Sequence, residues 1–135
     1  MTLLRMRLAP SAWNARKVRD HLVRVSTTMD MSSGRLEEFV TAIGEAFANA
    51  VEHAGTRQAI EIVVRVDTEK RLVATVRDRG KGIDRAAIDQ ALPPVRAERG
   101  RGIPLMRRCT SSMRISLPKS GGTLVSLFWE RGLLT

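Results

Sequence analysis

The chain has 135 residues, of which 23 are Lys or Arg and 14 are Asp or Glu, so its formal net charge is +9. This length is typical of one domain, and 43% apolar residues are enough for a hydrophobic core. No stretch approaches the roughly 20 apolar residues that cross a membrane, and the single cysteine excludes an internal disulfide and a cysteine-based zinc site. We therefore expect one soluble, cytoplasmic domain over residues 1–135, with no membrane as a partner.

The positive charge is concentrated in two blocks. Residues 1–35 have a net charge of +5 and residues 77–114 of +6, whereas residues 36–76 have −3. A basic chain first suggests nucleic acid or an acidic membrane as its partner. Proteins that bind single strands stack the bases on aromatic side chains, but this chain has no Tyr, three Phe and two Trp. Direct nucleic-acid binding is therefore the least favoured function for this chain.

The N-terminal half predicts one strand and two helices. Residues 3–8 alternate apolar and charged side chains, which is typical of a half-buried strand. Ser11 is placed to cap an amphipathic helix over residues 12–29. Apolar residues recur at helical spacing over residues 35–54, the strongest helix signal in the chain, and Gly55 follows as a typical helix stop.

The C-terminal half predicts four strands and a short helix. Residues 59–66 and 72–76 are rich in Val and Ile and flank a polar turn, which indicates a hairpin. Residues 102–110 suit a short helix, and residues 113–117 and 123–130 suit two further strands. This order predicts an α+β two-layer sandwich, with a mixed, mostly antiparallel sheet and the helices on one face.

The long predicted helix carries a set of polar side chains. Glu45, Asn49 and Glu52 share the side opposite the apolar stripe. A solvated polar face is the plain alternative, but Asn is a poor helix former in mid-helix. Small neighbours are also consistent with a pocket wall, namely Ala42, Ala46 and Ala48. We regard Glu45 and Asn49 as candidate functional residues.

Two glycine motifs follow the predicted hairpin. The sequence Asp78–Ile83 (DRGKGI) comes at a strand end, where a carboxylate can accept a hydrogen bond from an amine and glycines allow close approach of a ligand. Gly100-Arg101-Gly102 comes just before a predicted helix, where backbone N–H groups favour phosphate. A Gly-rich turn and a hinge are the plain alternatives. Neither motif is a Rossmann fingerprint or a P-loop.

Three residues of reactive or bulky type are interpreted as structural. His53 comes at a helix end, where a cation suits the helix dipole, and Cys109 is interpreted as a small apolar residue. Trp13 is likewise interpreted as a structural residue. None of the three is a candidate site residue.

Four motifs taken in order resemble the N box, the two glycine boxes and the closing Gly-Thr of the ATPase superfamily shared by gyrase, Hsp90, histidine kinases and MutL. They are EAFANAVEHA (45–54), DRGKGI (78–83), GRGIPL (100–105) and GT (122–123). The short chain is similar to the smallest branch, the bacterial anti-sigma factor serine kinases. The chain departs from that pattern at Gly44, where a polar or larger residue is more common, and at Pro104.

This resemblance implies the Bergerat-type ATP-binding fold and a role for each motif residue. Glu45 would be the general base, and Asn49 would hold the Mg²⁺ that bridges the phosphates of ATP. Asp78 would bind the adenine amino group, with help from Thr123. The remaining nucleotide-binding residues would be those of the two glycine boxes, with an ATP lid at about residues 84–99: Gly80, Gly82, Ile83, Gly100, Arg101, Gly102 and Ile103.

The resemblance also implies the partners. The chain would phosphorylate a serine of an anti-anti-sigma factor and sequester a sigma factor in an ATP-dependent manner, as a homodimer that serves transcription regulation in a stress response. The alternative is a partner switch of the same fold that binds nucleotide without phosphotransfer. We assign the basic residues Arg16, Lys17 and Arg19 to docking of an acidic protein partner.

Overall fold

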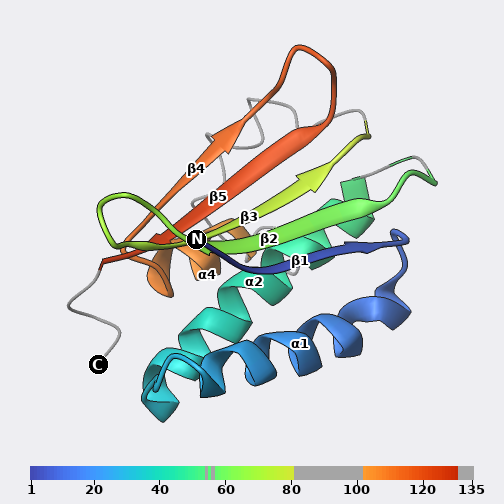
Figure 1. Cartoon of the computed structure of the whole chain (residues 1–135). Helices are drawn as coiled ribbons and strands as arrows, with labels where there is room; N and C mark the ends of the chain where they lie inside the picture. The colour runs from blue at the N-terminus through green and yellow to red at the C-terminus, as the bar shows by residue number, and fades with distance from the viewer. Residues whose placement is uncertain (54, 56, 81–101, 131–135) are drawn as a thin grey trace.

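The computed structural model describes residues 1–53, 55, 57–80 and 102–130 (Figure 1). All the elements predicted for these residues are present, and their ends agree with the prediction to within two residues, except that the first α-helix begins at Ala15 after a 3-10 turn over 12–14. The helices and strands are β1 (Thr2–Leu8), a 3-10 turn (Ala12–Asn14), α1 (Ala15–Thr27), α2 (Ser33–His53), β2 (Ile60–Val66), β3 (Leu72–Asp78), α4 (Gly102–Arg108), β4 (Ser112–Ser116) and β5 (Thr123–Trp129).

The strands form one sheet in the order β1-β2-β3-β5-β4. Each of the four neighbouring pairs is antiparallel, which confirms the predicted antiparallel arrangement and leaves no parallel pair among the described strands. β2 and β3 are joined directly by the predicted tight turn, whereas β5 lies between β3 and β4. The strand that opens with Gly122-Thr123 is therefore next to the strand that ends at Asp78.

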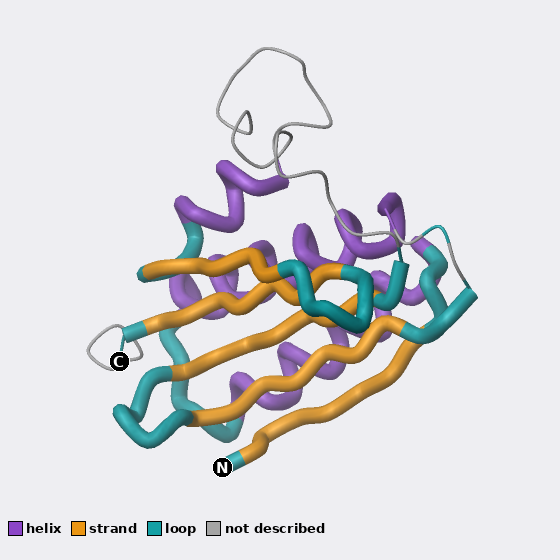
Figure 2. Tube along the Cα trace, turned by 90° about the horizontal axis from the view of Figure 1, so that it is seen from above, coloured by secondary structure: helices purple, strands orange, loops and turns teal. Residues whose placement is uncertain are grey.

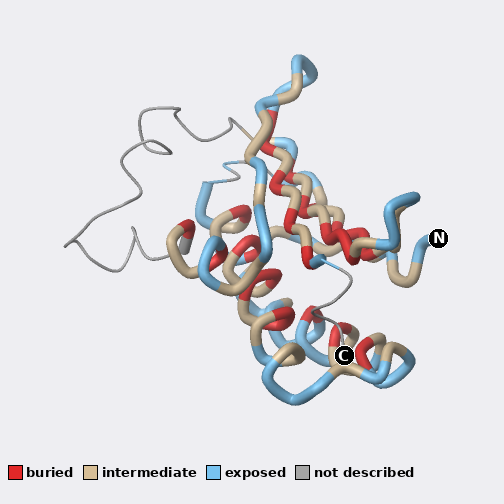
Figure 3. The backbone as a smooth tube through the Cα atoms, turned by 90° about the vertical axis from the view of Figure 1, so that its left-hand side faces the viewer, coloured by how far each residue is buried: buried red, intermediate tan, exposed pale blue. Residues whose placement is uncertain are grey.

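The helices cover one face of the sheet, as predicted (Figures 1 and 2). Figure 3 shows the buried residues between the two layers. The core includes large side chains from both layers, and the rings of Phe39 on α2 and Trp129 on β5 meet edge to face, 5.3 Å between centroids. Such aromatic pairs contribute about 0.5–1.5 kcal/mol beyond the area that they bury. The α+β two-layer sandwich is thus confirmed.

The apolar stripe of α2 is wider than the sequence pattern suggested. Phe39, Ile43 and Phe47 are fully buried, as predicted. Ala42 and Ala46 are also fully buried against the core, so the interpretation of these alanines as a pocket wall is wrong. They are small because the helix packs closely on its neighbours over this whole side. The third alanine of that set, Ala48, is exposed.

The hairpin turn between β2 and β3 is held by one carboxylate. Asp67 Oδ1 accepts hydrogen bonds from the backbone N–H groups of Glu69 and Arg71, each at 2.9 Å, and its Oδ2 accepts one from Arg71 Nε at 2.9 Å. The Arg71 backbone N–H is the main reason that the pKa of the Asp67 carboxyl lies below its usual value. The stabilising effect of this carboxylate is therefore lost only as the pH falls through that lowered pKa.

The interpretation of Trp13 as a structural residue is wrong. Its side chain is 91% exposed, in the 3-10 turn before α1. Its backbone N–H donates to Ser11 Oγ at 3.3 Å, so Ser11 caps the 3-10 turn, whereas the N-cap residue of α1 is Asn14. The indole is exposed because the turn projects the side chain away from the core that α1 covers.

The glycine just before β5 lies very close to the end of β3. Gly122 has a φ of +77°, and a Cβ there would overlap the Asp78 carbonyl oxygen and lie 2.9 Å from the Arg79 Cα. Left-handed backbone and lack of space both require glycine at this position. The close approach brings the turn before β5 against the end of β3.

We expect Gly122→Ala to destabilise the domain by about 1–3 kcal/mol, because the new methyl group meets backbone and the φ angle is strained. Urea unfolding followed by circular dichroism measures this change. The matched control is Gly34→Ala in the first turn of α2, where a Cβ meets nothing within 4 Å and the change should stabilise the protein by up to about 1 kcal/mol. Equal stability of the two variants would contradict the close approach.

Candidate functional site

The end of β3 presents a buried carboxylate. Asp78 is only 4% exposed, and its Oδ1 accepts a hydrogen bond from the backbone N–H of Gly80 at 2.9 Å. This bond fixes the orientation of the carboxylate and leaves lone pairs of Oδ2 for another donor. A buried carboxylate at a strand end is suited to recognise an N–H group of a ligand, because burial makes each such bond selective.

Thr123 lies beside Asp78. The two residues are partners in the register of β3 and β5, and Thr123 is 1% exposed. Strand pairing thus joins two candidate residues that are 45 positions apart in the sequence. The order of the sheet, which places β5 next to β3, is what forms this pair.

Arg77 is a residue that the sequence reasoning missed. Its Nη2 donates to Ser120 Oγ at 2.9 Å and to the Gly121 carbonyl oxygen at 3.1 Å. These bonds tie the turn before β5 to the end of β3, next to Asp78. The alternation of β3 could have suggested the role, because it directs Arg77 to the face opposite Asp78, where no helix covers the sheet.

Glu45 and Asn49 lie one turn apart on α2, outside its buried side. Both are partly exposed, and neither side chain has a hydrogen bond or ion pair with another described residue. The placement of these two side chains on one side of the helix confirms the sequence geometry. Free oxygen atoms of a carboxylate and an amide, one turn apart, can together contact a metal ion and a reacting hydroxyl group.

The two halves of the candidate site lie on α2 and at the end of β3, and these two elements pack against each other. Figure 1 shows α2 and β3 ending toward the same side of the molecule. Asn49 lies four residues before the end of α2, and Asp78 is the last residue of β3. Helix α2 also packs against β3 and α4, so the first turn of α4 belongs to the same layer.

The glycine boxes are described only in part. Gly82, Ile83, Gly100, Arg101 and the predicted lid at 84–99 lie outside the described residues. Gly102 is the first residue of α4, which confirms the predicted helix start within the second glycine box. Ile103 is 9% exposed and belongs to the core, so a contact of this residue with nucleotide would involve its backbone.

The donor atoms fit magnesium bound together with phosphate. Among the described residues, no group of three or more His, Cys, Asp or Glu side chains could hold a metal ion. Mg²⁺ needs no such group, because it is bound by one or two protein oxygens, by water and by phosphate. The free amide oxygen of Asn49 is suitable as the single protein ligand.

Cys109 is unsuited to act as a nucleophile. Burial is the main cause that raises the pKa of its thiol above the usual value, so the group stays protonated near neutral pH. Its carbonyl oxygen accepts a hydrogen bond from Trp129 Nε1 at 2.8 Å. These contacts agree with the interpretation of Cys109 as a structural residue.

The family model for the histidine kinase-like ATPase domain matches residues 8–129. The chain belongs to this family. Family membership confirms the superfamily that the four motifs resemble, and it implies ATP binding by this domain. No curated protein sequence matches the chain significantly.

Several solved protein structures are similar to this chain in fold. The RsbU and RsbW domains of Rv1364c from Mycobacterium tuberculosis have a TM-score of 0.71 at 22% identity, over 94% of this chain and 32% of that one. The SiaB–SiaC complex from Pseudomonas aeruginosa gives 0.70 at 13% identity, over 94% and 89% of the two chains. A blue-light activated histidine kinase, EL346 from Erythrobacter litoralis, gives 0.58 at 17% identity, over 83% and 60%. The present chain thus spans about a third of the length of the Rv1364c chain.

These likenesses concern the fold, because each sequence identity lies below 25%.

The lengths and hydropathy of the helices bear on membrane insertion. None of the helices in the described ranges is long and apolar enough to cross a bilayer.

We expect Asp78→Asn to weaken ATP binding about 10-fold to 100-fold. The Gly80 N–H holds the amide oxygen, so the new NH₂ group faces the amino group of the base, donor against donor. Isothermal titration calorimetry with ATP measures the affinity. Asp30→Asn is the control, because it makes the same change in the exposed turn between α1 and α2. Wild-type affinity in Asp78→Asn would remove this residue from the adenine site.

Proposed function

We propose that this protein is an ATP-dependent serine kinase and anti-sigma factor of a partner-switching system. It would phosphorylate an anti-anti-sigma factor and sequester a sigma factor. The observation that carries the proposal is that a histidine kinase-like ATPase fold presents a buried carboxylate, Asp78, at the end of β3 and two polar side chains on α2, Glu45 and Asn49, that bond to no described residue. Fold similarity to the RsbW domain of Rv1364c and to the SiaB–SiaC complex supports it.

Nucleotide binding would use both layers of the fold. Asp78 would accept a hydrogen bond from the adenine amino group, and the buried Thr123 beside it would help to orient the base. Gly80 and Gly82 would allow the ligand close to the backbone. At the other end of the ligand, Asn49 would hold Mg²⁺, and Gly100, Arg101 and Gly102 would bind phosphate before α4.

Phosphotransfer would depend on a proton acceptor close to the incoming serine. Bound Mg-ATP supplies the γ-phosphoryl group and neutralises the charge that develops on it. Glu45 accepts the proton of the serine hydroxyl as its oxygen forms the new bond to phosphorus and the bond to the β-phosphate oxygen breaks, which leaves ADP. The protein then contributes positioning and electrostatics rather than a covalent intermediate, in agreement with the protonated thiol of Cys109.

The remaining parts of the proposal come from the family resemblance. They are a homodimer, a cytoplasmic location and transcription control in a stress response. A binding protein that switches partners on nucleotide without phosphotransfer is the alternative. The free carboxylate of Glu45 favours the kinase, because pure nucleotide binding has no use for a proton acceptor beside the metal ligand.

We expect Glu45→Ala to retain Mg-ATP binding and to lower phosphoryl transfer at least about 100-fold, as is typical for loss of a general base. The assay incubates the protein with γ-labelled ATP, Mg²⁺ and candidate anti-anti-sigma proteins, and locates the label. Glu37→Ala, an exposed glutamate in the first half of the same helix, is the matched control. An unchanged rate would exclude Glu45 as the base, and tight ATP binding without any transfer by the wild type would favour the alternative.

A further inference from the structure

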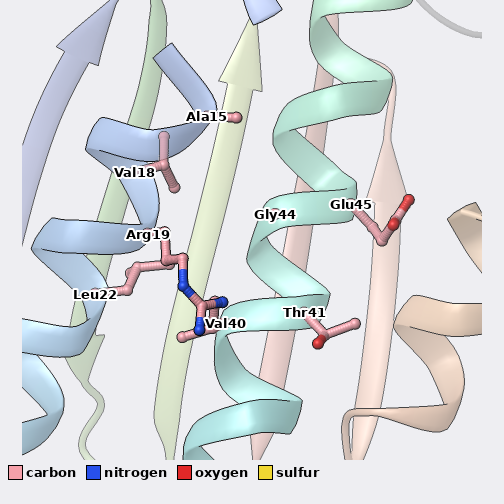
Figure 4. A pocket seen from close by; sticks show the side chains of 8 residues that line it. All are labelled: Ala15, Val18, Arg19, Leu22, Val40, Thr41, Gly44 and Glu45. Carbon is pink, nitrogen blue, oxygen red and sulfur yellow. The ribbon is translucent and has the colours of Figure 1, made fainter. Parts of the chain in front are cut away.

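A cavity of about 250 Å³ lies between α1 and α2. Its lining comes from both helices and consists of Ala15, Val18, Arg19, Leu22, Val40, Thr41, Gly44 and Glu45 (Figure 4). Asn49, Asp78 and Thr123 do not contribute to it. The cavity, which we name the α1–α2 groove, therefore shares Glu45 with the proposed chemistry but includes none of the described residues that we assign to nucleotide binding.

The groove has an apolar floor and a cationic rim. Val18, Leu22 and Val40 are buried residues that form its floor. In Figure 4 the side chain of Arg19 extends from α1 toward α2, and its guanidinium has no ion pair or hydrogen bond with any described residue. Glu45 points to the side of α2 away from α1. A free guanidinium above an apolar floor is complementary to an apolar side chain that has a carboxylate beside it.

Gly44 keeps the groove open. A Cβ at this position would meet nothing within 4 Å, so packing does not require glycine. Glycine in mid-helix costs about 0.5–1 kcal/mol relative to alanine. The chain tolerates this cost at a position of α2 that lines the groove, one residue before Glu45.

An exposed tryptophan lies close in the sequence to a residue that lines the groove. Trp13 is 91% exposed and lies two residues before Ala15, which lines the groove. The other exposed large apolar residues of the described chain, Met1 and Leu117, lie next to β1 and after β4. Tryptophan is the side chain most enriched among the residues that dominate protein interfaces.

The exposed surface of α1 is strongly basic. Its exposed charged residues are four cations and one carboxylate, namely Arg16, Lys17, Arg19, Arg24 and Asp20. A second copy of the chain that docked here by the same surface would bring like charges together. A membrane would need an apolar helix face, but Val18 and Leu22 of α1 are buried in the core. The charge pattern favours an acidic protein.

We propose that the α1–α2 groove is the docking site for the protein partner, and that it receives an apolar side chain from an acidic segment of that partner. Trp13 packs against the segment, and Arg19 pairs with a carboxylate next to the inserted side chain. The partner's identity rests on the proposed function, whereas the site rests on the groove, the exposed indole and the charge. Because the groove and Glu45 share α2, docking here brings the partner to the helix that carries the proposed base.

The test measures binding and phosphorylation of candidate anti-anti-sigma proteins with Mg-ATP at about 0.15 M salt. Trp13→Ala, Arg19→Glu and Gly44→Leu should each raise the Kd and the KM for the protein substrate at least 10-fold, with kcat and ATP affinity within about 2-fold of the wild type. The matched controls are Leu117→Ala, which removes another exposed apolar side chain, and Arg24→Glu, which makes the same charge change on α1 outside the groove. Both should stay within about 3-fold of the wild type.

The outcomes separate the two proposals. Phosphorylation with a wild-type KM in Trp13→Ala and Arg19→Glu would overturn the groove and leave the kinase intact. Binding that these variants abolish, without phosphorylation by the wild type, would support the groove and reject the kinase. Dissociation of a wild-type dimer by Trp13→Ala in light scattering, or loss of binding to phosphatidylserine vesicles, would assign the surface to a second copy or to a membrane. Failure of every candidate to bind would reject both proposals.

Discussion

The packing of α2 against the sheet sets the direction in which every side chain of this helix points. Phe39, Ile43 and Phe47 are fully buried in that contact, and full burial of each such side chain contributes about 1.5–3 kcal/mol. Because 3.6 residues make one turn, the same packing fixes the direction of Glu45 and Asn49, which lie outside the buried side. A rotation of the helix that buried the Glu45 carboxylate would cost several kcal/mol. The hydrophobic core therefore orients the polar side chains on which the proposed chemistry depends.

The sheet supplies the second half of the site by a different constraint. Asp78 is a buried carboxylate that accepts a backbone hydrogen bond from Gly80 through one of its two oxygens. The close approach of Gly122 and the bonds of Arg77 hold the neighbouring turn against this end of β3. A polar group that is buried and fixed discriminates strongly between ligands, since a wrong ligand leaves it without a partner. Rigid backbone around Asp78 is what would make adenine recognition selective.

The net charge of +9 divides into parts with different uses. In the N-terminal block the exposed cations of α1 include Arg19, which lines a groove whose lining does not include Asn49, Asp78 or Thr123. The block that contains Glu45 and Asn49 is net acidic, as suits residues near a metal ion. Separation of the basic α1 surface from the acidic part of α2 would let one helix pair serve a protein partner on one side and a metal nucleotide on the other. Under our proposal Trp13, which the sequence alone placed among structural residues, would belong to the first of these surfaces.

The sequence by itself determined the elements, because periodicities of 2 and 3.6 and capping residues act locally: Ser11, Gly55 and the ladder of α2 are at their predicted places. It also determined that Glu45 and Asn49 share one side of α2, since helical spacing fixes that geometry. Tertiary structure alone decided which strands are neighbours, and thus that Thr123 pairs with Asp78. It alone decided that Trp13 is exposed and that Ala42 and Ala46 are core residues. Burial and strand order depend on contacts between distant segments, which no local pattern encodes.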